Sequence, residues 1–282
     1  MKKIFSLLFL VLIFGCEKVI NLDLDFSNQN YVIDAKINKH VNSLSGFSEV
    51  NISKSREYFS DNINYINDAV VKIIEKETSK EYVLEFVKDG KYKINIPNIL
   101  ESSEYELIVI HDNYQFSSVE KLTKSSLIDN VVQGDRNSLS GDEIEIITTF
   151  TDLDQMDNYF LFEFGDKGNL QPARDLYING NSFSFSYFIE KTEIPNSKKL
   201  KVKMEGIDYN YFKYMIQVVI QTNTQNGPFS TPPAPIKGNI LNIKDSNSVV
   251  FGYFKVCEFD EFILENIIIA VSYTHLTLPT SG

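Results

Sequence analysis

The chain contains no tryptophan, two cysteines and three histidines among its 282 residues. Sugar-binding sites rely on flat aromatic platforms, tryptophan above all, so its absence weakens the case for a glycan-binding protein. His40, His111 and His275 are too far apart in the sequence to form a metal-binding or catalytic histidine motif. Cys257 lies in a strand-like segment, and we expect a buried, unreactive thiol.

Sequence motifs that carry catalytic chemistry are also missing. The chain has no His-Glu-x-x-His, no Gly-x-Ser-x-Gly and no phosphate-binding loop. We therefore predict no enzyme activity, no catalytic residue, no cofactor and no metal. The densest acidic cluster, Asp152, Asp154 and Asp157, runs directly into a strand-like segment. We interpret it as a solvated turn, with a calcium loop as the alternative.

The charge balance excludes one class of partner. Asp and Glu number 38 and Lys and Arg number 27, which gives a formal net charge of −11. Nucleic-acid binding depends on basic residues that neutralise phosphates, and so does electrostatic docking on anionic lipid. We predict no nucleic-acid partner and no basic patch that attaches the protein to a membrane.

The first sixteen residues predict a lipid anchor instead. Lys2 and Lys3 precede an apolar run, which is too short to cross a bilayer because that takes about 20 residues. The segment Ile13-Phe14-Gly15-Cys16 resembles a bacterial lipobox. We predict that residues 1–15 are a signal peptide and that lipidated Cys16 attaches the protein to the membrane. The alternative is an ordinary signal peptide followed by a chance cysteine.

The pattern after residue 30 is β-rich almost throughout, and it predicts a mostly β fold. Short apolar or alternating runs predict strands at 31–37, 50–53, 69–74, 82–87, 92–96, 105–110, 143–150, 158–164, 182–188, 199–204 and 249–254. One segment differs, because Tyr211, Met215 and Val218 recur at helical spacing. It predicts one amphipathic helix over residues 208–222, capped by Asp208.

The spacing of the strands and a polar segment near residue 124 predict two β-sandwich domains, with the helix in the C-terminal half. The N-terminal half resembles Ig-like or prealbumin-like modules, and this resemblance implies domains of that type. The predicted divisions are a lipidated tether at 16–30, an N-terminal β-sandwich at 31–124 and a C-terminal β-rich domain at 125–270. Residues 271–282 carry no formal charge and resemble translated sequencing-adapter read-through. We interpret them as a non-native tail, with a genuine tail strand as the alternative.

A proline-rich loop follows the predicted helix, and aromatic residues flank it. This region offers the best candidates for an exposed aromatic patch, with plain packing of the helix as the alternative. The candidate partner-binding residues are Tyr209, Tyr211, Phe229, Pro232 and Pro233.

Several short motifs resemble one known family. In the first half they are the lipobox, Tyr31-Val32-Ile33-Asp34-Ala35-Lys36-Ile37, Asp68-Ala69-Val70-Val71 and Asp89-Gly90-Lys91-Tyr92. In the second half they are Phe150-Thr151-Asp152, Asn158-Tyr159-Phe160, Tyr211, Gly227-Pro228-Phe229-Ser230-Thr231-Pro232-Pro233, Gly238-Asn239-Ile240 and Gly252-Tyr253-Phe254. Together they resemble the Bacteroidota lipoproteins of domain of unknown function 4249, whose members have no established reaction.

This resemblance implies an accessory role, because similar proteins tend to be encoded near TonB-dependent outer-membrane receptors. We expect a non-enzymatic binding component of a TonB-dependent uptake system, anchored in the outer membrane. Two other functions stay open: a structural or adhesive surface protein, and a carboxylate-based glycosidase or peptidase. The residues after Cys16 give only a weak surface-export signal, so the sequence does not assign the leaflet.

The predicted anchor has a direct test. Replacing Cys16 with Ala removes the acylated thiol, and we expect the mature protein to move from the membrane fraction to the soluble fraction. Fractionation at high salt, followed by immunoblotting, measures the distribution. A Cys16→Ala variant that stays with the membrane would show that another feature attaches the protein.

Overall fold

The computed structural model describes residues 29–56, 62–136, 138, 141–154, 157–166, 168–175, 180–223, 234–245 and 248–269. These residues form a mostly β structure with one α-helix and one short 3-10 helix. The elements are β1 (Tyr31–His40), β2 (Gly46–Lys54), β3 (Asn64–Tyr65), β4 (Val70–Glu75), β5 (Lys80–Val83), β6 (Glu85–Lys88), β7 (Lys91–Ile96), β8 (Glu104–His111), β9 (Tyr114–Lys121), β10 (Ile128–Gln133), β11 (Glu143–Thr151), β12 (Tyr159–Phe164), β13 (Asn169–Arg174), β14 (Ser182–Glu190), η1 (Lys191–Glu193), β15 (Leu200–Ile207), α2 (Tyr209–Asn223), β16 (Leu241–Asn242), β17 (Val250–Phe251) and β18 (Phe254–Leu264).

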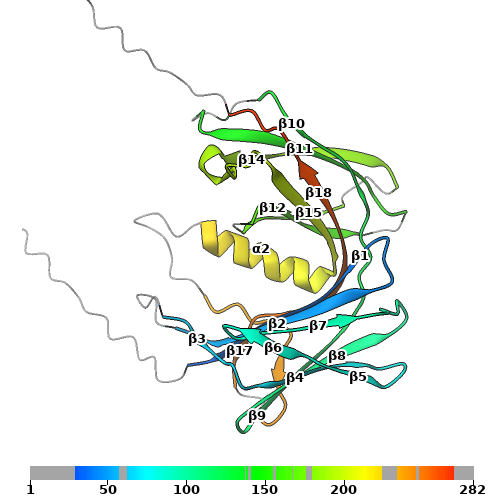
Figure 1. The fold of residues 1–282 in the computed structure, drawn as a ribbon, viewed down its shortest axis with the longest axis vertical. Coiled ribbons are helices and arrows are strands. Elements are labelled where there is room, and N and C mark those ends of the chain that lie inside the picture. The colour runs from blue at the N-terminus through cyan, green and yellow to red at the C-terminus, as the bar shows by residue number, and fades with distance from the viewer. Residues whose placement is uncertain are drawn as a thin grey trace, which may run out of the picture.

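The largest sheet contains ten strands and runs through the middle of the molecule (Figure 1). Its main order is β13-β12-β15-β18-β1-β2-β7-β6, and the short strands β17 and β3 pair with β1 and β2. Strands from both ends of the chain therefore share one sheet. The junction is the parallel pair of β1 and β18, in which Ala35 lies opposite Phe254 and Asn38 opposite Cys257.

The two faces of this sheet differ in character, because successive residues of a strand point to opposite sides. On one face, Ile33 and Ile37 of β1 and Phe254 of β18 are fully buried in a hydrophobic core. The five-stranded sheet β16-β9-β8-β4-β5 supplies the other side of this core, with residues such as Leu107 and Phe116. This packing is sandwich-like.

A second core lies farther along the same face. Phe162 of β12 and Val202 of β15 are buried there against Ile146 of β11, which belongs to the three-stranded sheet β10-β11-β14. Phe262 and Leu264 of β18 pack against this core, while Phe254 belongs to the first. Since these three residues have even numbers on one strand, both sandwich-like packings lie on the same face of the ten-stranded sheet.

Helix α2 covers part of the opposite face, and Figure 1 shows the curved sheet bending around it. Tyr211 and Met215 of the helix are buried against Leu161 of β12 and Ile207 of β15. Among the described helices, none combines the length and the apolar character that a membrane crossing requires.

The predicted mostly β fold and the predicted helix are confirmed, since α2 spans Tyr209–Asn223 where residues 208–222 were expected. The sandwich-like packings share a sheet because β18, the last described strand, returns to pair with β1, the first described strand. A domain boundary near residue 124 stays a prediction. The signal peptide, nearly all of the tether and the predicted non-native tail lie outside the described residues.

The structure corrects two predicted strands. The segment 82–87 was expected to be one strand, but it divides at Leu84, which is buried and whose N–H donates to the Val71 carbonyl at 2.9 Å. The chain passes there from β5 in the five-stranded sheet to β6 in the ten-stranded sheet. The strand expected at 249–254 also differs, because β18 begins at Phe254 and continues to Leu264.

The start of α2 depends on one capping side chain. Asp208 Oδ1 accepts hydrogen bonds from the backbone N–H groups of Asn210 at 2.7 Å and Tyr211 at 3.1 Å. We expect Asp208→Ala to lower the free energy of unfolding by about 0.5–2 kcal/mol, since the N–H groups lose their acceptor. Asp208→Asn keeps an acceptor and serves as the control in denaturant titrations. Equal stability of the Ala variant and the wild type would contradict this role.

Candidate functional site on the helix side of the sheet

Charged side chains form a row across the sheet face that carries α2. The strand register places Lys93 opposite Glu49, Glu49 opposite Lys36 and Lys36 opposite Lys255, on β7, β2, β1 and β18 in turn. Directly opposed side chains in a sheet are close enough to interact. The strand register therefore produces the row. The position of Lys255 opposite Lys36 depends on the parallel pairing of β1 with β18.

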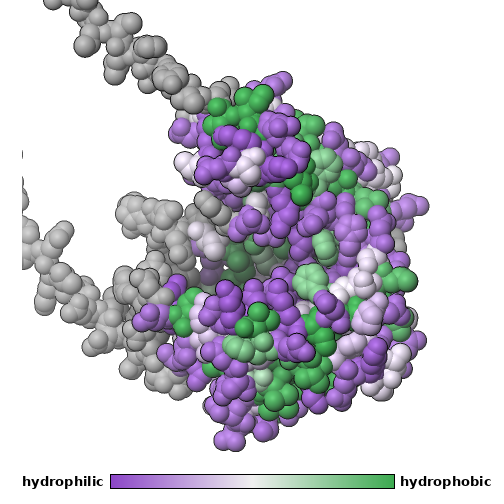
Figure 2. All heavy atoms as spheres, in the orientation of Figure 1, coloured by the Kyte–Doolittle hydropathy of each residue, from purple (hydrophilic) through white to green (hydrophobic). Residues whose placement is uncertain are grey.

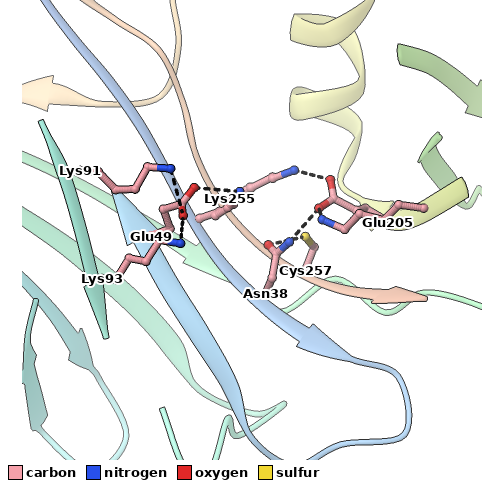
Figure 3. A network of polar contacts seen from close by, with 9 residues as sticks. Asn38, Glu49, Lys91, Lys93, Glu205, Lys255 and Cys257 are labelled. Atoms are coloured by element: carbon pink, nitrogen blue, oxygen red, sulfur yellow. Dashed lines mark hydrogen bonds and ion pairs between the residues drawn. The ribbon is translucent and has the colours of Figure 1, made fainter. Parts of the chain in front are cut away.

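One end of the row is open to solvent and centres on Glu49. Its carboxylate oxygens lie 3.2 Å from Lys36 Nζ, 3.7 Å from Lys91 Nζ and 2.6 Å from Lys93 Nζ (Figure 3). The Glu49 side chain is 10% exposed, whereas the lysine side chains are 30% to 46% exposed. Burial alone would raise the pKa of Glu49, but the hydrogen bond from Lys93 and the charge of Lys36 lower it to about 2.

The other end of the row is buried and centres on Glu205 of β15. Lys203 Nζ lies 2.6 Å from Glu205 Oε1, Lys255 pairs with the other oxygen, and Asn38 Nδ2 donates to Oε1 at 2.8 Å. Burial works against the charged form of Glu205, but the two lysines outweigh it and hold its pKa far below the usual range. The same attraction raises the pKa of Lys255, so both groups stay charged in the protein interior.

Cys257 lies beside this buried end. Its Sγ donates to Asn38 Oδ1 at 3.3 Å, and its side chain is buried (Figure 3). Burial, together with the negative charge of Glu205, raises the pKa of the thiol to about 12. Such a thiol stays protonated near neutral pH, which agrees with the expectation of a buried, unreactive residue.

The face between the two ends remains accessible to water. Asp34, two residues before Lys36 on β1, is exposed. The surrounding protein nevertheless displaces enough water to raise the pKa of its carboxyl group, and the charges of Lys255 and Lys36 partly oppose this rise. Figure 2, in the orientation of Figure 1, shows the surface hollowed in the region of α2, with hydrophilic residues along its edges. The charges of the row lie on the sheet face that carries α2, and their fixed positions suit binding.

Helix α2 brings only part of the predicted aromatic patch to the surface. Tyr209 is 51% exposed, and Lys213 Nζ lies 4.4 Å from its ring centroid. Tyr211 is 7% exposed and lies over the buried charges, with Lys255 Nζ 5.0 Å from its ring centroid. Its predicted place in an exposed patch is wrong, because the helix turns this residue toward the sheet. Phe229, Pro232 and Pro233 lie outside the described residues.

Two sequence motifs from the end of the chain meet beside the helix. Asn239 Nδ2 donates to the Phe254 carbonyl at 2.7 Å, and Asn239 Oδ1 accepts from the Phe254 N–H at 2.8 Å. A Cβ at Gly238 would overlap the carbonyl of Gly252, and Gly252 itself has a positive φ of 95°. Gly238 is therefore required because the backbone of Gly252 approaches it closely. Gly252 is required both for close approach to the Ile33 carbonyl and for its positive φ.

The acidic cluster at 152–157 is not a solvated turn throughout, which corrects that prediction. Asp152 is 4% exposed, and burial followed by a hydrogen bond with Asp175 raises the pKa of its carboxyl group. Asp157 instead pairs with Arg174 at 3.2 Å on the surface. A direct hydrogen bond places the Asp152 and Asp175 carboxyl groups closer than the roughly 5–9.5 Å at which glycosidase carboxylates stand.

The two described histidines have structural partners. His111 Nδ1 lies 2.7 Å from the Tyr31 hydroxyl, and its Nε2 lies 3.1 Å from Asp68. His40 Nε2 lies 3.0 Å from Asp260. Within the described part of the chain, no three His, Cys, Asp or Glu side chains are grouped in a way that would hold a metal ion.

Sequence analysis did not single out the charged row. A partial signal was present, since Asp34 and Lys36 alternate with the apolar residues of β1, and Lys91 and Lys93 with those of β7. Alternation alone assigns charges to one face of each strand. It does not reveal that β1 lies beside β18 and therefore did not bring Lys255 into the same row.

The fold and this face describe a mostly β protein whose central sheet packs two hydrophobic cores on one side and carries α2 and the charged row on the other. The family model described as domain of unknown function (DUF4249) matches residues 17–262, so the chain belongs to this family.

Other comparisons add little. No curated protein matches the chain. A solved structure from a 1.5-MDa bacterial ice-binding adhesin, reported in connection with host cell surface retention, has a TM-score of 0.21 and 12% sequence identity to the chain. The match covers 64% of this chain and 60% of that one, and likeness at this level carries no argument.

The buried end of the row predicts a strong effect on stability. Glu205→Gln leaves Lys203 and Lys255 buried without a counter-charge, and we expect the free energy of unfolding to fall by about 3–5 kcal/mol. Glu81→Gln, in the exposed pair with Lys72, is the control and should cost less than about 1 kcal/mol. Urea denaturation at pH 7 measures both.

The pH dependence of this effect has a defined sign. The pKa of Glu205 is lowered from 4.5 on folding, so its contribution to stability is present above pH 4.5 and declines as the pH falls below that value. The difference between wild type and Glu205→Gln should therefore shrink in acid. A stability difference between wild type and Glu205→Gln that grows in acid would contradict the role of Glu205 as the buried counter-charge. Equal losses of stability in Glu205→Gln and Glu81→Gln would contradict it as well.

Proposed function

We propose that the protein is a non-enzymatic binding component of the outer membrane, attached through lipidated Cys16. Its partner would be a TonB-dependent receptor, as the family resemblance implies. The observation that carries this proposal is the open end of the charged row, where Lys36, Lys91 and Lys93 are held around Glu49 on the sheet face that carries α2. A fixed set of exposed charges suits recognition of a complementary surface.

The charge at the open end favours an acidic contact surface on the partner. Three lysines surround one glutamate, and they still outnumber the carboxylates by one when Asp34 is included. This local excess of positive charge contrasts with the formal net charge of −11 for the whole chain. An acidic loop would gain attraction here and would meet repulsion over much of the remaining surface.

Positioning by Glu49 strengthens the argument. Long lysine side chains lose conformational entropy when a partner fixes them, and that loss reduces affinity. The Glu49 carboxylate already restrains the ammonium groups of Lys36, Lys91 and Lys93 before any partner arrives. Part of the conformational entropy of the lysine side chains is therefore already lost when the protein folds, which leaves less to lose on binding. The lysines remain exposed enough to contact a partner.

The experiment compares two pairs of lysines in the full-length, acylated protein. Lys91→Gln/Lys93→Gln removes charge from the open end, while Lys72→Gln/Lys121→Gln removes equal charge from exposed pairs on the five-stranded sheet. After mild detergent extraction from native outer membranes, co-purification and mass spectrometry quantify the receptor. We expect the first variant to recover at least about tenfold less receptor and the second to match the wild type.

Other outcomes would overturn the proposal. Equal recovery by both variants would exclude the open end as the contact surface. Recovery of no receptor by the wild-type protein, after chemical crosslinking in intact membranes, would count against the accessory role and favour a structural or adhesive protein. Melting temperatures of both variants within about 3 °C of the wild type would show that the fold is intact.

A further inference from the structure

A separate pocket lies where α2 approaches the end of β9 and the segment before β16. Its volume is about 370 Å³, and its lining includes Glu120 of β9, Tyr214 and Gln217 of α2, Asn239 and Tyr253. This volume is near the lower end of the range for small-molecule sites, about 300–1,000 Å³, and suits one sugar ring or one or two amino-acid residues. None of these residues belongs to the charged row around Glu49.

Glu120 supplies the carboxyl group of this pocket. Asn239 Nδ2 donates to Glu120 Oε1 at 2.7 Å, and Asn239 is itself fixed by two hydrogen bonds to the backbone of Phe254. The orientation of the Glu120 carboxyl group is therefore set by β18 through Asn239. Oriented carboxyl groups at a pocket wall are suited to binding a charged group of defined position.

No cation neutralises Glu120 within the described part of the chain. Burial raises the pKa of its carboxyl group to about 7, the hydrogen bond from Asn239 opposes this, and the negative charge of Asp208 adds to it. Lys213 and Lys237 also line the pocket, but neither contributes to the pKa shift of Glu120, and the ammonium group of Lys213 lies over the ring of Tyr209. This contrasts with Glu49, whose three lysines lower its pKa to about 2.

Two tyrosines and two amide side chains of the lining also complement a cation. The rings of Tyr214 and Tyr253 lie 5.1 Å apart at 47° and form an aromatic wall. Ring faces attract ammonium groups and pack against the carbon atoms that carry them. The amide groups of Asn210 and Gln217, both on exposed residues of α2, add hydrogen-bonding capacity beside the wall.

We propose that this pocket binds a small ligand through a primary ammonium group, with Glu120 as the counter-ion and Tyr214 and Tyr253 as the aromatic wall. The ammonium group takes the position of the cation that the protein does not supply. Two sources share this chemistry, an amino sugar and the amino terminus of a short peptide. The proposal does not depend on the lipid anchor or on a receptor.

The experiment uses purified full-length protein and matched pairs of probes, measured by isothermal titration calorimetry at pH 7, where the amines of the probes are still mostly protonated. Glucosamine is compared with N-acetylglucosamine, and glycylglycine with N-acetylglycylglycine. Acetylation removes the ammonium charge and leaves most of the ligand unchanged. We expect at least one free amine to bind at least about tenfold more tightly than its acetylated counterpart, and the pair that responds identifies the source.

Three variants locate the binding. Glu120→Gln should weaken binding of the free amine at least about tenfold, because the counter-charge is lost. Glu104→Gln, which alters an exposed glutamate on neighbouring β8, should leave binding unchanged. Since Glu120→Gln also changes the contact with Asn239, Tyr214→Leu provides an independent test, as it removes one ring of the wall and should weaken binding as well.

The pH dependence provides a further readout. Affinity for the free amine should rise between pH 5 and pH 7, because Glu120 ionises in this interval while the amine stays mostly protonated, and this rise should vanish in Glu120→Gln. The other charged or titratable groups that line the pocket or act on Glu120 are Asp208, Lys213, Lys237, Tyr214 and Tyr253, and burial raises the pKa of the two tyrosines above this interval.

The proposal fails on any of three results. The first is equal affinity for free and acetylated probes. The second is full binding by Glu120→Gln. The third is no binding of either free amine up to about 10 mM, which is weaker than a specific small-ligand site. Because the protein is purified and no receptor is present, failure here leaves the receptor proposal to its own experiment.

Discussion

The parallel pairing of β1 with β18 is the constraint on which the rest of the structure depends. It joins the first described strand of the chain to the last, with Ala35 opposite Phe254 and Asn38 opposite Cys257. Without it, β2 and β7 would lose their connection to β15 and β12 in the ten-stranded sheet. Parallel neighbours need a long connection between them, and here most of the protein forms that connection.

Because successive residues of a strand point to opposite faces, the two faces of the sheet carry different residues and make different contacts. On one face, β18 contributes to both hydrophobic cores, and this couples the two sandwich-like packings through a single strand. On the other face, the same strand carries Lys255 and Cys257 beneath α2. Burying charge is costly unless partners are well placed, and the register of β1, β15 and β18 places Lys203 and Lys255 on Glu205. The helix can cover this region because the charges beneath it are paired.

Local sequence patterns predicted the elements that depend on near neighbours. The helix followed from spacing and from Asp208 as its cap, and β1, β7 and β11 followed from the alternation of apolar and polar residues. Strand β9 was missed because Ser117 and Ser118 interrupt its apolar pattern, and it is held by pairing with β8 and β16. The burial of Asp152 depends on Asp175, which reaches it only in the folded chain. The pocket around Glu120 likewise combines residues from β9, α2 and two later segments, so no local pattern marks it.

The glutamates of this protein show how neighbours decide the role of one residue type. Glu49 and Glu205 are both surrounded by lysines, remain ionised and organise the positive groups around them. Glu120 is partly buried as well, but an amide and a nearby aspartate take the place of the lysines, so its ionisation near neutral pH is incomplete. A carboxylate that already has its cations gains little from another, whereas one without a cation gains the full interaction when a ligand supplies it. The same physical rule therefore underlies both proposals, in which Glu49 positions lysines for a protein partner and Glu120 contacts a small cationic ligand directly.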